Sequence, residues 1–116
     1  MRIAGAARLF LLYVIWRSLG ADWAGRSLLN ALGEKDENLS AIAATLLARS
    51  GERAEPLVLD ALRRRQNLDL TIPLFGDVAR PAHAEELERL HRDPDPKIAR
   101  AAKDALEVLQ LRRSRT

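Results

Sequence analysis

Apolar side chains recur every three or four residues along most of this chain. From residue 24 onward, short amphipathic segments alternate with turns that contain Gly, Pro, Asn, Asp or Ser. This spacing places the apolar residues on one side of an α-helix and does not fit the strict alternation of a β-strand. The pattern predicts six helices, at residues 24–33, 38–50, 53–65, 68–79, 81–92 and 95–111.

Local signals at the helix ends support these assignments. Asp95 is expected to be an N-cap and Pro96 a first helical residue, and Asp22 is expected to cap the helix that starts near residue 24. Pro73 lies inside the segment 68–79, where it removes a backbone donor. We expect Pro73 to kink that helix or to delay its start by one turn.

The helices form pairs that repeat along the chain with a period near 29 residues. The segment Leu28–Leu32 resembles Val58–Leu62 at an offset of 30, and Val58–Leu62 resembles Glu86–Leu90 at an offset of 28. Two helices per repeat at this period are typical of an α-solenoid, in which each pair buries its apolar side against the next. The sequence therefore predicts an all-α superhelix of about three helix pairs over residues 22–111, preceded by an extra apolar helix.

One repeat also resembles a known family. The segment 93–106 has an Asp-rich turn, an aliphatic residue, Arg100 and an Ala-Ala-x-x-Ala-Leu stripe. It resembles HEAT-like repeats of the phycobilisome-lyase type. The last repeat matches well, the first moderately, and the middle one departs at Pro73. The resemblance implies a HEAT-like solenoid that docks proteins, and a bond from Arg100 to an Asp of a neighbouring turn.

The N-terminal segment, residues 1–21, combines apolar and basic residues. Its uninterrupted apolar run, Leu9–Trp16, is eight residues long, whereas crossing a bilayer takes about 20. Three interpretations remain open: a helix docked on protein, a membrane-associated anchor, or a signal peptide. The first two use the same side chains. We expect docking through the aromatic and basic residues Arg8, Phe10, Tyr13, Trp16 and Arg17, joined by Arg2 on a membrane.

Charge and composition narrow the function classes. Residues 1–20 and 108–116 carry three arginines each and no acid, while residues 21–107 carry 13 basic and 16 acidic residues. A folded body with an acidic excess argues against binding to nucleic acid. The chain has no cysteine, so disulfides and thiolate chemistry are excluded. Residues 112–116 are interpreted as a basic C-terminal tail.

The sequence shows no pattern typical of a catalytic, cofactor or metal site. His83 and His91 lie eight residues apart without ligands at metal-binding spacing, and we interpret them as two solvent-facing histidines. Neighbouring acids such as Glu85 and Glu86 point in different directions on a helix. We therefore predict neither enzymatic activity nor a bound cofactor or metal. The alternatives are a bilin lyase-like enzyme subunit, by the resemblance, and a HEAT-like nucleic-acid binder.

These observations favour a scaffold or accessory subunit that binds another protein. In a HEAT-like architecture the second helix of each pair lines the concave side. The candidate partner-binding positions on these helices are Ala41, Ala44, Thr45 and Arg100. The sequence does not identify the partner. We expect a cytoplasmic protein, with a membrane-associated position as the alternative.

Overall fold

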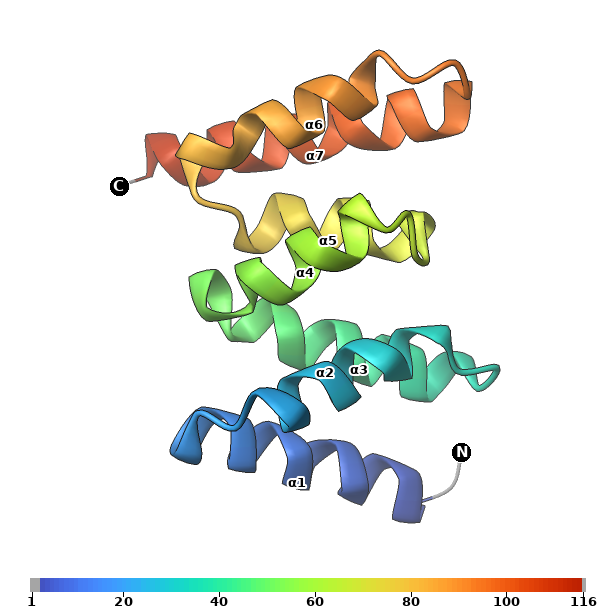
Figure 1. Cartoon of the computed structure of the whole chain (residues 1–116), viewed down its shortest axis with the longest axis vertical. Coiled ribbons are helices and arrows are strands. Elements are labelled where there is room, and N and C mark those ends of the chain that lie inside the picture. The colour runs from blue at the N-terminus through green and yellow to red at the C-terminus, as the bar shows by residue number, and fades with distance from the viewer. Residues whose placement is uncertain (1–2, 116) are drawn as a thin grey trace. The chain divides into compact units, whose positions relative to one another are not determined.

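The computed structural model describes the backbone of residues 3–115 and the side chains of residues 5–115. The predictions that involve Met1, Arg2 and Thr116 lie outside these residues. All regular structure in the described part is helical, without a strand (Figure 1). The predicted all-α class is therefore confirmed.

The chain divides into two compact units, Met1–Ser50 and Gly51–Thr116. This division coincides with neither boundary that the sequence predicts, after residue 21 or after residue 111. Each unit is described by itself below.

The first unit consists of three α-helices. They are α1 (Ile3–Leu19), α2 (Asp22–Asn30), which continues into a 3-10 turn at Ala31–Gly33, and α3 (Glu37–Arg49). α1 packs against both α2 and α3, which also contact each other (Figure 1). The interior contains apolar side chains from all three helices, namely Leu9, Leu12, Trp16, Ala24, Leu28, Ala43, Leu46 and Leu47.

The second unit contains the remaining helices of the described chain. They are a 3-10 turn at Gly51–Ala54, α4 (Glu55–Arg63), α5 (Leu68–Val78), a 3-10 turn at Pro81–His83, α6 (Ala84–His91) and α7 (Pro96–Ser114). α5 packs against α4 and α7, and α6 packs against α7. Phe75 and Ile72 of α5, Val58 of α4 and Leu87 of α6 are fully buried.

The six helices predicted from residue 24 onward all exist, but some of their ends differ. Asp95 caps α7 as expected, because its Oδ1 accepts the Lys97 N–H at 2.9 Å. Asp22 is not an N-cap: it is the first residue of α2, and Ala21 occupies the cap position without a side-chain bond. α7 continues to Ser114 rather than ending at residue 111, so Arg112 and Arg113 belong to the helix.

α5 runs without interruption through Pro73. Of the two effects expected of Pro73, a kink or a delayed start, the delayed start is therefore wrong. The helix begins at Leu68, and backbone bonds from Leu70 and Thr71 to the Asn67 carbonyl form its first turn. Pro73 is exposed, so its ring occupies the outer side of the helix and does not interfere with the buried side.

The pattern of buried residues repeats in the first helix of the first two predicted pairs. Ala24, Leu28, Ala31 and Leu32 are buried in the first unit, and the residues 30 positions later, Ala54, Val58, Ala61 and Leu62, are buried in the second. Leu87 of α6 is the buried residue 29 positions after Val58. The structural register of the third pair therefore differs by one residue from the offset of 28 that the sequence predicts.

Candidate functional site

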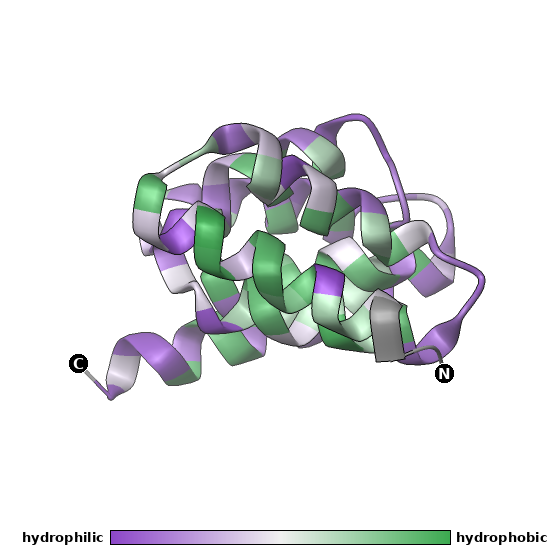
Figure 2. Ribbon diagram, turned by 90° about the horizontal axis from the view of Figure 1, so that it is seen from below, coloured by the Kyte–Doolittle hydropathy of each residue, from purple (hydrophilic) through white to green (hydrophobic). Residues whose placement is uncertain are grey.

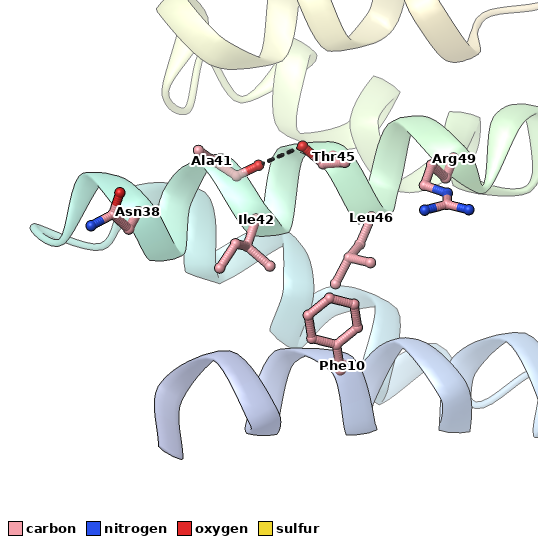
Figure 3. Close-up of a pocket in the computed structure, with 7 residues that line it drawn as sticks. All are labelled: Phe10, Asn38, Ala41, Ile42, Thr45, Leu46 and Arg49. Carbon is pink, nitrogen blue, oxygen red and sulfur yellow. Dashed lines mark hydrogen bonds between the residues drawn. The ribbon is translucent and has the colours of Figure 1, made fainter. Parts of the chain in front are cut away.

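An apolar groove lies within the first unit, between α1 and α3. Its volume is about 290 Å³. Phe10 of α1 forms one wall, with its ring directed toward α3 (Figure 3). The α3 residues that line it are Asn38, Ala41, Ile42, Thr45, Leu46 and Arg49. Phe10 from the predicted docking set thus shares one groove with Ala41 and Thr45 from the predicted partner-binding set.

The local structure of α3 explains this surface. Asp36 caps the helix, since its Oδ1 accepts the Asn38 N–H at 2.9 Å. The Thr45 hydroxyl donates to the Ala41 carbonyl at 2.9 Å, so its donor is used inside the helix (Figure 3). Ala41 and Thr45 are exposed, small lining residues, and Ile42 and Leu46 of α3 point toward the Phe10 ring (Figure 3). The groove is therefore apolar along most of its length.

Sequence reasoning missed four of the lining residues, Asn38, Ile42, Leu46 and Arg49. A signal was present, because the α3 lining residues follow the spacing i, i+3, i+4, i+7, i+8 and i+11 of one helix face. Arg49 lies at one end of the groove and makes that end basic. Within the described residues, its exposed side chain makes no hydrogen bond or ion pair.

The predicted docking residues of α1 do not share one environment. Phe10 is 53% exposed, whereas Trp16 is only 3% exposed. Trp16 is therefore part of the interior of the first unit, and its side chain is not presented to a partner. The reason is helical spacing: Trp16 lies on the side of Leu9 and Leu12, which packs inward.

Tyr13 and Arg17 form a local pair on α1. The Arg17 guanidinium donates to the Tyr13 hydroxyl at 2.7 Å, one helical turn away. Its carbon lies 5.8 Å from the centre of the Tyr13 ring. The positively charged Arg17 guanidinium therefore lies beside the half-buried Tyr13 ring, near the C-terminal end of α1.

Arg8 lies at a second, smaller cavity of the first unit. This cavity has a volume of about 130 Å³ and is lined mainly by residues of α1, α2 and the turn after α2, namely Gly5, Arg8, Leu9, Ser27, Asn30, Ala31, Glu34 and Leu39. Its polar lining includes Glu34, so it differs in character from the apolar groove.

The other two predicted partner-binding residues do not line the groove. Ala44 is half-buried on α3, beside the core residue Ala43. Arg100 is exposed on α7 of the second unit, and within the described residues its side chain has no hydrogen bond or ion pair. The bond to an Asp that the family resemblance implies is therefore absent. Asp93 instead accepts from Arg65 at 3.1 Å.

A buried carboxylate in the second unit was not predicted. Glu55 is 3% exposed at the start of α4, and its Oε2 accepts the backbone N–H of Arg80. His83 Nδ1 lies 2.9 Å from the same oxygen, and the Arg80 side chain lies 3.8 Å from the carboxylate. The predicted solvent-facing position of His83 holds only in part: 41% of the side chain is exposed, while Nδ1 is buried against Glu55. The cluster ties the turn after α5 to α4, and no periodic pattern marks such a contact between residues 25 positions apart.

Two carboxyl groups of the second unit have shifted pKa values. Partial desolvation raises the pKa of Asp77, and the nearby Arg112 guanidinium opposes this shift. The backbone N–H of Asp95 lowers the pKa of Asp93, with a further contribution from Arg65. The described residues contain no group of three or more potential metal ligands. None of the described helices is long and apolar enough to span a bilayer.

Comparisons with known proteins do not assign a family. No protein-family model matches the chain, and neither a curated protein nor a solved structure matches it.

Proposed function

We propose that this chain is a non-enzymatic scaffold or accessory subunit, built from HEAT-like helix pairs, that binds another protein through the groove between α1 and α3. Recurring burial supports the repeat part of this proposal. Leu28 and Val58, 30 residues apart, are both completely buried. The boundary between the two units also falls after α3, where the first predicted pair ends.

The observation that carries the binding part is the exposed Phe10 ring beside an apolar groove. A phenylalanine that leaves 53% of its surface in water forgoes part of the roughly 1.5–3 kcal/mol that its burial supplies. A partner side chain inserted between Phe10 and Ile42 would recover this energy. Aromatic anchors next to apolar recesses are common centres of protein interfaces.

The shape and charge of the groove favour a helical partner segment. Its α3 side extends from Asn38 to Arg49, a distance of about 16 Å at 1.5 Å per residue. An amphipathic helix of three turns fits this length and can place apolar residues along it. Arg49 at one end would pair with an acidic residue of that helix.

Substitution of Ala41 tests the proposal. Ala41→Glu places a longer, charged side chain in the groove, while its exposed position leaves the fold intact. Partners are captured with the wild-type chain and with the variant, and their affinities are then measured with purified proteins. We expect a loss of about tenfold or more, because the new carboxylate must be desolvated next to apolar side chains.

Gln110→Glu is the matched control, because it adds the same carboxylate at an exposed position of α7. We expect this variant to keep every partner that the wild-type chain binds. Recovery of the same proteins with the same affinity by Ala41→Glu would refute the groove as the binding site. Removal of α1 is a poorer test, since it would expose the side of the first unit that Leu9, Leu12 and Trp16 cover.

A further inference from the structure

The outer side of α1 is apolar, and its exposed residues Leu11 and Val14 do not line the groove. Leu11 is 60% and Val14 is 54% exposed, although the opposite side of the same helix is buried. At 100° per residue, both side chains project away from the direction of Leu9, Leu12 and Trp16. Figure 2 shows the hydrophobic colour running along successive turns of α1. Two more exposed apolar side chains follow, Leu19 at the end of α1 and Trp23 in the first turn of α2.

The charges on α1 all have one sign. Within α1 the charged residues are Arg8 and Arg17, and the first acid of the chain is Asp22. Nine residues separate the two arginines, which corresponds to about 13 Å along a helix. They therefore bracket the apolar residues Leu11 and Val14. Arg8 is exposed, and Arg17 is exposed while it donates to Tyr13.

This arrangement restricts what can cover the outer side of α1. A second copy of the chain would bring the same arginines and no acid, so two α1 helices would repel each other. Leu11 and Val14 project from a helix, so a protein partner would have to supply a groove shaped to receive them. A fluid apolar phase needs no such groove, and its anionic surface attracts arginine.

We propose that the outer side of α1 rests on an anionic phospholipid surface. Leu11 and Val14 enter the boundary between headgroups and acyl chains, and Arg8 and Arg17 contact lipid phosphates. The inner side of α1 stays packed on α2 and α3, so the helix lies in the plane of the surface. This inference goes beyond the proposed function and does not require an occupied groove.

Co-sedimentation of the full chain with vesicles tests this assignment. The vesicles contain phosphatidylcholine alone or phosphatidylcholine with phosphatidylserine. We expect binding to the mixed vesicles, much weaker binding to phosphatidylcholine, and loss of binding as salt is raised. A chain that stays in the supernatant with anionic vesicles at low salt overturns the assignment and leaves the outer side of α1 to a protein.

Substitutions locate the binding surface. The double variant Leu11→Ser with Val14→Ser should reduce binding to the mixed vesicles about tenfold or more, because two exposed apolar side chains no longer enter the lipid. Leu111→Ser is the matched control: Leu111 is 59% exposed on α7, and its replacement should leave binding unchanged. Equal binding by the double variant and the wild-type chain would overturn the proposal. Far-UV circular dichroism verifies that each variant keeps its helix content.

A second pair of variants tests how much the arginine charge contributes to vesicle binding. Arg8→Gln should weaken binding about fivefold, as expected for one arginine removed from an anionic surface. Arg100→Gln removes another exposed arginine, on α7, and should have no effect. If Arg100→Gln weakens binding as much as Arg8→Gln, the attraction is not localised to α1 and the proposal fails. Ala41→Glu affects the groove alone, so failure of the protein-binding proposal stays distinguishable.

Discussion

Gly76 lies where α5 packs against α7, and a methyl group at this position would overlap the backbone of Ala105. An added Cβ would lie 2.9 Å from the Ala105 carbonyl oxygen and 3.0 Å from its Cα. Backbone atoms of a packed helix cannot move aside as a flexible side chain can. Glycine is therefore required here for close approach, although it is a poor helix former.

Gly76→Ala should consequently destabilise the protein. Alanine gains about 1 kcal/mol of helix propensity, and the overlap with Ala105 costs about 1–3 kcal/mol. We expect a net loss on the order of 1 kcal/mol in the free energy of unfolding, measured by urea denaturation. A variant as stable as the wild-type chain would show that α5 and α7 can separate without cost.

Asp93 makes stability depend on acid pH. Its Oδ1 accepts the Asp95 N–H at 2.9 Å and its Oδ2 accepts from Arg65 at 3.1 Å, and these contacts lower its pKa below the ordinary value of 3.8. A lowered folded-state pKa stabilises the folded protein above the unfolded value. This contribution is lost as the pH falls through the folded value.

Asp93→Asn should therefore reduce stability at neutral pH but not well below pH 3.8. The asparagine can still accept the Asp95 N–H, so the variant isolates the loss of charge. Urea denaturation at both pH values measures the difference. Asp104→Asn is the control, since Asp104 is exposed and makes no hydrogen bond or ion pair with the described residues. If Asp93→Asn were still less stable than the wild-type chain at acid pH, the role proposed for the charge would be contradicted.

Among the elements, α5 depends on other helices to satisfy its C-terminal end. The Gly76 and Ala79 carbonyls accept from Arg112 of α7, at 2.7 and 3.1 Å, and the Arg80 N–H donates to Glu55 of α4. The last carbonyls of a helix have no partner within it, so the two bonds from Arg112 replace a local cap. Arg112 was predicted to belong to a basic tail, and instead it belongs to the packing of the second unit.

Arg112→Gln should destabilise the second unit by about 1–3 kcal/mol, because the two carbonyls lose charged donors. Arg115→Gln removes an exposed arginine from the helix end and should change the free energy of unfolding by less than about 0.5 kcal/mol. Urea denaturation of both variants measures the contrast. If both variants lowered the free energy of unfolding equally, the bonds from Arg112 to Gly76 and Ala79 would add nothing to stability beyond the positive charge of an arginine.

The helices could be predicted because each follows from a local pattern in the sequence. The contacts between helices do not follow from such a pattern. The stripe from Leu39 to Leu47 specifies α3, and Asp95 with Pro96 specifies the start of α7. The groove at Phe10 depends on how α1 approaches α3, which spacing within one helix cannot encode. The same holds for Glu55, whose partner Arg80 lies 25 residues away. Phe10, Ala41 and Thr45 could thus be named from the sequence, whereas their position around one groove could not.

For the whole molecule, recurrence of one buried position connects the sequence repeat with stability. Leu28, Val58 and Leu87 are spaced by 30 and 29 residues, and each is completely buried on the first helix of its predicted pair. A repeat protein distributes its core over its units, so truncation at the equivalent position should be costly in every repeat.

Leu28→Ala and Leu87→Ala should each cost about 2–5 kcal/mol, and Val58→Ala somewhat less, because it removes fewer buried methyl groups. Leu111→Ala supplies the comparison: the same truncation of a 59% exposed leucine should change stability little, since water already covers most of that side chain. Thermal and urea denaturation of the four variants measure these costs. The repeat interpretation requires all three buried positions to respond. If one of the three tolerated truncation as well as Leu111 does, that helix pair would not share the packing of the other two, and a common repeat would no longer account for the burial pattern.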